Sequence, residues 1–384
     1  MSKVKFLHCA DIHLDTPFTS LESSEGISSM RRQDLKETFQ RIIEVAKTES
    51  VDLILISGDL YEHNYVKKST IHFINDLFRG ISEIKVVIVP GNHDPFIVNS
   101  FYKSYPWSDN VCILTQDNPY ILYPELEVCV YGVGFQNFFE EKPLEYNIKP
   151  IYPEYINMIL VHGTVDMNFK QSVYNATTSE NLHSLHMDYV ALGHFHNRID
   201  NVGGYGTIYN PGSPEPLGFD ETGEHGVYLG TVTKENERKS ERVIQFVKVC
   251  KKFYENIELQ VNGCNTNEQI ISQIESILAN DEEKKKNGLF SITLKGYVES
   301  GFKIEILQLL SYFRGQVCYL KVKDETTADY NFEEILQEPG LRGLFARKIF
   351  SKIELTEDEY EKKLLIKALY FGIEALEKGS VEIN

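Results

Sequence analysis

The sequence predicts an α+β protein, and three observations support this fold class. Short apolar, β-branched runs of strand length recur along the first 240 residues, and each run ends in a glycine or a polar cluster. Stretches with apolar residues at helical spacing lie between several of these runs. Further strand-like and helix-like segments follow, and two candidate helices come last, so we expect a second, smaller α+β domain and a C-terminal helical segment.

The composition is that of a folded protein with more than one core. The chain has 384 residues, of which 42% are hydrophobic and 25% charged, which is enough for two or three domains. Its six cysteines show no CxxC pairing, which is typical of reduced thiols in a cytoplasmic protein. The sequence shows no secretory signal and no run of membrane-spanning length, so we expect no membrane contact. The net charge of −17 argues against coating along DNA by bulk electrostatics, but a local positive site stays compatible with it.

The first part of the chain is expected to form a sheet of buried strands. Five apolar runs end in polar clusters, and they begin at Val4, Asp52, Ile84, Met158 and Asp188. Residues 31–50 and 67–81 carry apolar side chains with a helical period between the first three runs. Ligands of such sheets collect at the carboxyl ends of the strands, where all five polar clusters lie.

Three domains or segments are expected along the chain. The charged stretch 233–242 indicates a boundary, so we expect the first domain to span residues 1–240. Strand and helix patterns predict a small α+β domain over residues 241–330. Residues 331–384 hold two candidate helices with apolar stripes, and Pro339 breaks the first of them.

The polar clusters after the strands contain the residue types that bind divalent metals. The candidate residues are Asp11, His13, Asp59, Asn92, His93, His162, His194 and His196. Their mixture of nitrogen and oxygen donors predicts a site for two metal ions that share one carboxylate, and zinc, iron and manganese all suit it. Neutral histidine and asparagine ligands leave such a site electropositive, which suits a phosphodiester anion, and the metals generate a nucleophile from water at neutral pH. Because histidine must be neutral to bind a metal, metal affinity is expected to fall below about pH 6.5.

The ordered motifs "DIH", "GDLY", "GNHD", "VHG" and "GHFH" resemble those of the calcineurin-like metallophosphoesterase superfamily. Within it the chain is similar to SbcD-type DNA double-strand-break repair nucleases, and most similar to the YhaO-like branch, which "HCADIHLD", "YVALGHFH" and "NPGSPEPLGFDE" match. The resemblance covers about residues 4–220 and is looser beyond residue 240. It implies a four-layer α/β/β/α sandwich of two mixed sheets. It also implies a metal-dependent exonuclease or endonuclease that hydrolyses DNA phosphodiester bonds in the cytoplasm.

The resemblance implies a role for each matching residue. One metal ion would take Asp11, His13, Asp59 and His196 as ligands. The other would take Asp59, Asn92, His162 and His194, with Asp59 bridging the two ions. His93 would contact the scissile phosphate, and the two ions would be manganese.

The chain departs from the SbcD-type pattern at one position. That pattern often has a second catalytic histidine three residues after the bridging aspartate, where this chain has Glu62. His63 follows directly and is therefore the second candidate catalytic residue, by a change of register. Gly212 and Ser213 in "NPGSP" are candidate substrate-binding residues through their backbone amides, although the same sequence also suits an ordinary turn.

The resemblance also implies partners. Residues 241–330 would be a capping and DNA-binding domain, and the apolar stripes of the C-terminal helices would dock on an SbcC-like coiled-coil ATPase. Family members commonly form homodimers through the nuclease domain.

Two alternatives to a DNA nuclease stay open. One is a non-catalytic DNA-binding or scaffold subunit of an ATPase complex, and the other is a phosphodiesterase acting on another phosphoester. Phosphoprotein phosphatases of the superfamily carry "GDxVDRG", whose arginine holds a phosphomonoester, and the matching turn "GDLYEHN" has no arginine.

Overall fold

The computed structural model describes residues 1–384 except for six short segments, which are 22–25, 145–147, 168–173, 237–238, 279–280 and 379–384. The chain divides into two compact units, Met1–Tyr254 and Glu255–Asn384. Within the described ranges, no helix has both the length and the apolar character needed to cross a membrane.

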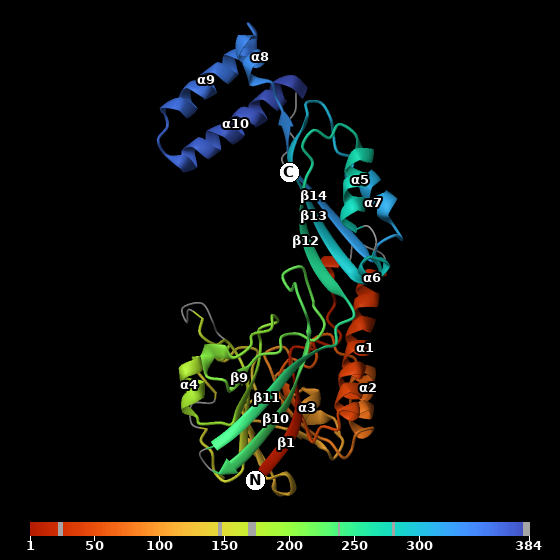
Figure 1. Ribbon diagram of the computed structural model, residues 1–384, viewed down its shortest axis with the longest axis vertical. Coiled ribbons are helices and arrows are strands. Elements are labelled where there is room, and N and C mark those ends of the chain that lie inside the picture. Colours follow the sequence, from red (N-terminus) through yellow and green to blue (C-terminus); the bar gives the residue numbers. More distant parts are fainter. Residues whose placement is uncertain (22–25, 145–147, 168–173, 237–238, 279–280, 379–384) are drawn as a thin grey trace. The chain divides into compact units, whose positions relative to one another are not determined.

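The first unit contains a six-stranded mixed sheet in the order β11-β10-β1-β2-β3-β4 (Figure 1). Its strands are β1 (Ser2–Cys9), β2 (Leu53–Ser57), β3 (Lys85–Val89), β4 (Val111–Ile113), β10 (Gly226–Asn236) and β11 (Lys239–Lys248). Strands β1 to β4 run parallel, whereas β10 pairs antiparallel with β1 and with β11. The carboxyl ends of β1, β2 and β3 therefore lie at one edge of the sheet.

A second mixed sheet has five strands in the order β5-β6-β7-β8-β9. Its strands are β5 (Tyr120–Tyr123), β6 (Val128–Gly132), β7 (Ile156–His162), β8 (Tyr189–Gly193) and β9 (Ile208–Tyr209). Strands β6 to β9 are parallel and β5 is antiparallel to β6. The five apolar runs identified in the sequence are thus β1, β2, β3, β7 and β8.

The two sheets pack face to face, and helices cover their outer faces. Phe6 and Leu55 of the first sheet share one buried core with Val130 and Leu160 of the second. Helices α1 (Ile27–Thr48) and α2 (Lys68–Arg79) lie along the outer side of the first sheet (Figure 1). Helix α4 (Ser179–Ser184) packs Leu182 against the outer face of the second sheet. The expected four-layer α/β/β/α sandwich is confirmed.

Short elements also lie in the described part of the first unit. They are η1 (Thr19–Leu21), α3 (Phe101–Ser104), η2 (Pro124–Leu126) and η4 (Val202–Gly204).

The first unit extends beyond the boundary that was expected at residue 240. The charged stretch 233–242, taken from the sequence as a boundary, instead contributes to the paired strands β10 and β11. Lys234 is buried in it, and its ammonium group lies 2.8 Å from a carboxylate oxygen of Asp188. The charged residues of this stretch therefore lie on two paired strands at the edge of the sheet, and one of them, Lys234, forms a buried ion pair.

The second unit contains a three-stranded sheet in the order β12-β13-β14. Its elements are β12 (Phe253–Gln260, which begins at the end of the first unit), α5 (Asn267–Leu278), α6 (Glu282–Asn287), β13 (Gly288–Glu299), α7 (Ile306–Phe313) and β14 (Tyr319–Asp329). Strands β13 and β14 are parallel. Phe290 and Ile292 of β13 are fully buried, as is Ile274 of α5, so this unit has an apolar core.

Three helices follow β14 in the described part of the chain: α8 (Phe332–Gln337), α9 (Leu341–Leu355) and α10 (Glu359–Lys378). They share a small core with Ala346 and Leu369 at its centre. α8 ends and α9 begins on either side of Pro339, as expected. Leu344 and Leu364 stay exposed, at 45% and 49% of their surface. A separate segment beginning at residue 331 stays a prediction.

Candidate metal centre

The candidate residues follow the carboxyl ends of five strands from both sheets. Those after the first sheet are Asp11, His13, Asp59, Asn92 and His93, and those from the second are His162, His194 and His196. Contacts between the two groups bring them to one place: Nε2 of His13 lies 3.2 Å from Nε2 of His196, across 183 positions of sequence. The packing of the two sheets therefore assembles a site from loops that are distant in the chain.

The backbone of this site is strained in several loops. Asp11, His13, Asp59 and His194 all have positive φ angles, which non-glycine residues seldom adopt. Each such conformation costs on the order of 1–3 kcal/mol and persists where surrounding contacts fix it. Here the amides of Asp11 and His13 donate to the carbonyls of Gly58 and Asp59. Strain at these positions indicates that the side chains are placed for a function.

Two glycines allow the strand ends to approach one another. A Cβ atom at Gly58, which has a φ of 89°, would collide with the ring of His162. A Cβ atom at Gly91 would collide with the carboxylate of Asp59. The glycines of "GDLY" and "GNHD" are therefore needed because other residues of the site occupy that space.

Asp94 joins the two turns after β2 and β3. Its carboxylate accepts hydrogen bonds from the amides of Gly91 and Leu60, each at 2.7 Å, and from the hydroxyl of Tyr102 at 2.7 Å. Burial and the charge of Asp59 raise the pKa of Asp94 to about 6. Asp94 therefore holds the loop that carries Asn92 and His93 against the loop that carries Asp59.

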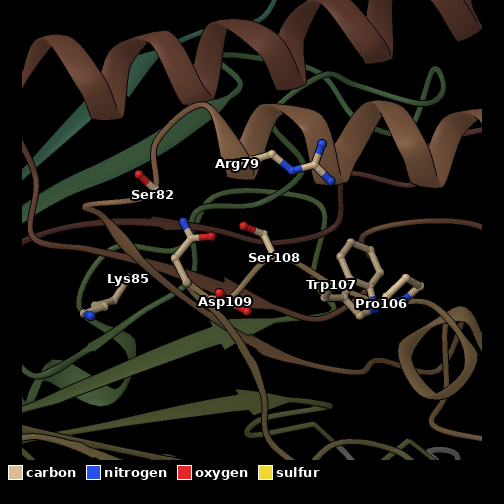
Figure 2. Close-up of a pocket in the computed structure, with 8 residues that line it drawn as sticks. Arg79, Ser82, Lys85, Pro106, Trp107, Ser108 and Asp109 are labelled. Atoms are coloured by element: carbon tan, nitrogen blue, oxygen red, sulfur yellow. The ribbon is translucent and has the colours of Figure 1, made fainter.

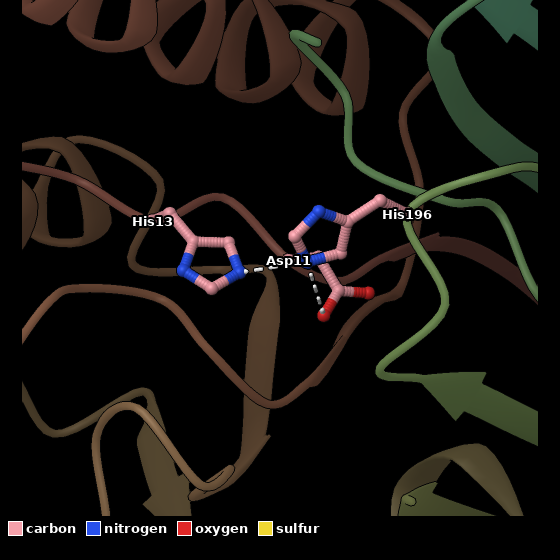
Figure 3. Close-up of side chains that lie close together, drawn as sticks. All are labelled: Asp11, His13 and His196. Carbon is pink, nitrogen blue, oxygen red and sulfur yellow. Dashed lines mark hydrogen bonds and ion pairs between the residues drawn. The ribbon is translucent and has the colours of Figure 1, made fainter. Parts of the chain in front are cut away.

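His13 and His196 face each other through their Nε2 atoms (Figure 3). Nδ1 of His13 lies 2.8 Å from Glu62, and Nδ1 of His196 lies 2.7 Å from Glu221. An ionised carboxylate can only accept, so the Nδ1 atoms carry the protons and the two Nε2 atoms are left as acceptors. An oxygen of Asp11, a third acceptor, lies 4.0 Å from Nε2 of His196.

His162 presents a second set of acceptors. Its Nδ1 lies 2.8 Å from the carbonyl oxygen of Ser57, so this nitrogen is the donor. Its Nε2 then faces Oδ1 of Asn92 at 3.0 Å and Oδ2 of Asp59 at 3.2 Å. The same Oδ2 lies 3.6 Å from Nε2 of His13, so the carboxylate of Asp59 stands between the two sets.

Acceptor atoms that face one another need a proton or a metal cation between them. Burial alone would lower the pKa of His162 and of His196. The carboxylate of Asp59 outweighs burial at His162, and that of Glu221 does so at His196, so that each pKa rises to about 9 without a metal. A divalent cation can take the place of these protons, because imidazole binds metals in its neutral form. The residues therefore fit divalent metals, and the ligand atoms of Asp11, His13 and His196 all lie within 4.8 Å of one another, as do those of Asp11, Asp59 and His162.

His194 lies beside these two groups. Its amide donates to both carboxylate oxygens of Asp11, at 3.0 Å each, and its ring packs edge-on against His162 with centroids 5.3 Å apart. Burial, with the nearby charge of His162, lowers the pKa of His194 to about 3, so the imidazole is neutral. Among the described residues it belongs to neither convergent group, and its ligand role stays a prediction.

Glu62 connects His13, a candidate metal ligand, to His93. Its Oε1 accepts from His13 at 2.8 Å and its Oε2 accepts from Nδ1 of His93 at 3.0 Å. Burial would raise the pKa of Glu62, but these two hydrogen bonds hold it at about 2. At His93 the hydrogen bond to Glu62 and the charge of Asp59 overcome burial and raise the pKa to about 9. The carboxylate that departs from the family pattern therefore has a defined place in the site.

His63 takes a different position from Glu62. Its amide donates to the carbonyl of His93 at 2.9 Å, and its ring packs against Phe138 with centroids 5.9 Å apart. Within the described chain its buried Nδ1 has no hydrogen-bond partner. Glu62, one residue earlier, makes the side-chain contact to His93, and a catalytic role for His63 stays a prediction.

Gly212 and Ser213 lie behind His196. Ser213 is fully buried, and its hydroxyl donates to Oε2 of Glu221 at 2.6 Å. Its amide donates to the carbonyl of His196 at 2.9 Å. Gly212 has a positive φ of 74°, which the turn requires. These hydrogen bonds hold Glu221 and the backbone of His196 in place. A contact of Gly212 or Ser213 with the substrate stays a prediction.

The sequence does not indicate that the carboxylates of Glu62 and Glu221 contact the candidate ligands His13 and His196. The available signal for Glu62 is its departure from the SbcD-type pattern, which often has a catalytic histidine at this position. Glu221 follows His196 by 25 positions, and that spacing carries no periodic signal.

A separate pocket lies at the opposite end of β3 (Figure 2). Its volume is about 520 Å³, and its lining includes Arg79, Lys85 and Trp107. Lys85 begins β3, whereas the "GNHD" turn follows the end of that strand. The pocket contains none of the candidate metal ligands and is distinct from the candidate site.

Comparison with known proteins gives a consistent set of relatives. Residues 4–198 match the family model described as "Calcineurin-like phosphoesterase". "Uncharacterized metallophosphoesterase YhaO" of Bacillus subtilis is 24% identical over 365 residues, which cover 90% of this chain and 87% of that protein. "DNA double-strand break repair protein Mre11" of Sulfurisphaera tokodaii is 28% identical over 319 residues, covering 77% and 74% of the two chains. The protein of the same description from Methanopyrus kandleri is 27% identical over 255 residues, covering 58% and 52%.

Proposed function

The chain belongs to the calcineurin-like phosphoesterase family, and on that premise we propose that it is a DNA nuclease with a centre of two manganese ions. The observation that carries the proposal is the convergence of acceptor atoms at the strand ends, with His93 beside them. The Mre11 relatives are described as DNA double-strand break repair proteins, which supports DNA as the substrate. The activity is hydrolysis of phosphodiester bonds, in exonuclease or endonuclease mode.

The ligands are assigned as the motifs suggest; the contacts support each of them except His194, and they also place Asp11 beside Asp59 and His162. Asp11, His13, Asp59 and His196 would hold one ion, and Asp59, Asn92, His162 and His194 would hold the other. Bound there, two divalent ions would lower the pKa of a shared water and polarise the phosphoryl oxygens. Glu62 and Glu221 keep the Nε2 atoms of His13 and His196 available for a metal, because each carboxylate accepts a hydrogen bond from Nδ1 of its histidine.

His93 is the proposed proton donor of the chain. Its side chain is 44% exposed, and Glu62 fixes its Nδ1, so Nε2 is free to face the substrate. Its amide donates to Oδ1 of Asp59 at 2.8 Å, which sets the distance of the ring from the metal ligands. In phosphodiester hydrolysis the Nε2 proton would pass to the leaving oxygen or stabilise charge on the phosphate, and solvent would restore it.

Glu62 also bears on the scaffold alternative. That alternative requires the substitution at this position to mark a lost function. Instead, the carboxylate contacts a predicted metal ligand and the predicted proton donor, at 2.8 and 3.0 Å. These contacts support an active site in which a glutamate has taken over the positioning of His93.

The partners that we propose follow from the exposed surfaces and from the relatives. The net charge of −17 leaves the metal centre as the attractive feature for DNA, and the part of residues 241–330 that belongs to the second unit would be a capping domain. The exposed Leu344 and Leu364 would dock on an SbcC-like coiled-coil ATPase, and two chains would pair through their nuclease domains. The buried thiols of Cys9 and Cys129 form no disulfide, which supports a cytoplasmic location.

Cleavage of end-labelled single-stranded and double-stranded DNA tests the proposal. The full chain is assayed with manganese, with magnesium and with EDTA, beside Asp59→Asn and His93→Ala. His72→Ala is the matched control, because His72 lies on α2 and contacts Tyr105. We expect manganese-dependent cutting by the wild type and the control and its loss in both site variants. Cutting that survives EDTA or Asp59→Asn would contradict the proposal. If the chain cleaves other phosphoesters but not DNA, a phosphodiesterase with another substrate is favoured.

A further inference from the structure

A row of aromatic rings leads from the candidate metal centre to the protein surface. The ring of Tyr174 lies 5.2 Å from that of His194, measured between centroids. Tyr174 also stacks on Phe139, with centroids 5.8 Å apart and planes inclined by 29°. Phe139 is 60% exposed. A stacked pair of rings therefore stands beside the site, and its outer member faces solvent.

Backbone contacts tie this pair to the loop after β7. The amide of Thr164 donates to the carbonyl of Tyr174 at 2.9 Å, and the amide of Asn175 donates to the carbonyl of Glu140 at 2.6 Å. The side-chain amide of Asn175 donates to the carbonyl of His162 at 2.8 Å. Because His162 is the last residue of β7, the segments that carry Tyr174 and Phe139 are held at a fixed distance from the candidate ligands.

Exposure of one phenylalanine is ordinary on a protein surface, but this ring has two unusual features. It stacks on a second ring that itself contacts His194, a candidate metal ligand. It also lies on a chain of net charge −17, whose overall field repels a phosphate backbone. A nucleic-acid strand held here needs contacts other than charge, and stacking of a base on an aromatic ring supplies about 1–3 kcal/mol per base.

We propose that the outer face of Phe139, backed by Tyr174, is the platform on which an unpaired DNA base stacks while its strand crosses the metal centre. This inference rests on the proposed nuclease function. A base inside a duplex already has neighbours on both faces, so the platform binds only bases that are unpaired or have left the stack. The site then prefers single-stranded DNA or frayed ends over intact duplex.

Binding of defined oligonucleotides to the full chain tests the platform. The probe is a labelled single-stranded dT oligonucleotide, compared with a series in which one base at a time is replaced by an abasic unit. Fluorescence anisotropy is measured in manganese with His93→Ala protein, which keeps the candidate metal ligands and should not cut the probe, with and without Phe139→Ala. Phe139→Trp retains a stacking ring. Tyr205→Ala is the matched control, because Tyr205 is 37% exposed and stacks on His183 before β9, at the amino ends of the strands.

We expect Phe139→Ala to weaken binding of the complete oligonucleotide about 5- to 150-fold, which corresponds to about 1–3 kcal/mol. One oligonucleotide of the abasic series should lack the base that stacks on Phe139. The parent protein should already bind this oligonucleotide more weakly, and Phe139→Ala should not weaken its binding further. Phe139→Trp and Tyr205→Ala should bind as the parent does. Equal affinities with and without the Phe139 ring, or an equal loss on every abasic probe, would overturn the platform. Failure of the wild type to cut any DNA would refute the nuclease function separately, because the binding comparison does not depend on cleavage.

Discussion

Replacing Glu62 by glutamine should disturb either metal binding or proton transfer, because the two oxygens of this carboxylate serve two histidines. Oε1 accepts from His13 at 2.8 Å and Oε2 accepts from His93 at 3.0 Å. A glutamine of the same shape has one oxygen and one NH2 group, so it can accept from one of the two histidines and must turn a donor toward the other. That histidine then rotates or changes its tautomer.

The size of the effect follows from the kind of contact that is lost. A hydrogen bond to a charged group contributes about 1.5–3 kcal/mol, and loss of a partner of a metal-binding histidine costs about 10- to 100-fold in metal affinity or activity. We expect a fall of about 10- to 100-fold in manganese affinity if the NH2 group faces His13, and a similar fall in kcat if it faces His93. The alkaline limb of the activity profile should also move to lower pH, because Glu62 raises the pKa of His93.

Calorimetric titration with manganese and kinetics between pH 6 and pH 10 measure these effects. Circular dichroism establishes that the variant is folded. Glu49→Gln is a suitable control, since Glu49 is an exposed carboxylate that pairs with Lys5. A folded Glu62→Gln protein with unchanged manganese affinity, unchanged kcat and an unchanged pH profile would refute this reasoning.

Three further predictions concern other groups of the first unit. Glu221→Ala should weaken manganese binding about 10- to 100-fold in calorimetry, because His196 loses its acceptor; unchanged affinity would contradict this role. The pKa values of His162 and His196 are raised to about 9, so manganese binding should release protons at pH 7.5 and should tighten as pH rises from 6.5 to 9. Equal heats of manganese binding in buffers of different ionisation enthalpy would contradict the release of protons. Burial lowers the pKa of His8 to about 3, so protonation favours the unfolded chain and stability should fall below pH 6.5 by about 1.4 kcal/mol per pH unit. Urea unfolding of His8→Gln should show a shallower pH dependence than the wild type, and identical slopes would exclude His8 as the cause.

The strands and the strand-end motifs could be predicted because their signals are local. Apolar runs beginning at residues such as Val4 and Asp52 correspond to β1 and β2, and the polar turns that follow them hold Asp11 and Asp59. Parallel strands with buried faces need continuous apolar sequence, and the order of the motifs along the chain adds to that signal. The edge at which these side chains meet follows from the common direction of the strands.

The remaining features depend on contacts between distant parts of the chain. Lys234 is neutralised by Asp188, 46 positions earlier, so the charged stretch around it resembles a linker when read locally. The pH window that we predict for metal binding also lies higher than an ordinary imidazole suggests, because Asp59 and Glu221 raise the pKa values of His162 and His196. The exposure of Phe139 beside the site likewise follows from the arrangement of loops, which periodicity does not describe.

The most direct measurement is the number of manganese ions bound per chain, determined by elemental analysis after equilibration and removal of free metal. Two ions per chain are predicted for the wild type and for the control His72→Ala. Asp59→Asn should hold fewer than two, because the carboxylate of Asp59 lies 3.2 Å from His162 and 3.6 Å from His13 and so serves both groups of ligands. A wild type that binds no manganese at saturation, or an Asp59→Asn protein that keeps two ions, would contradict the assignment of this centre.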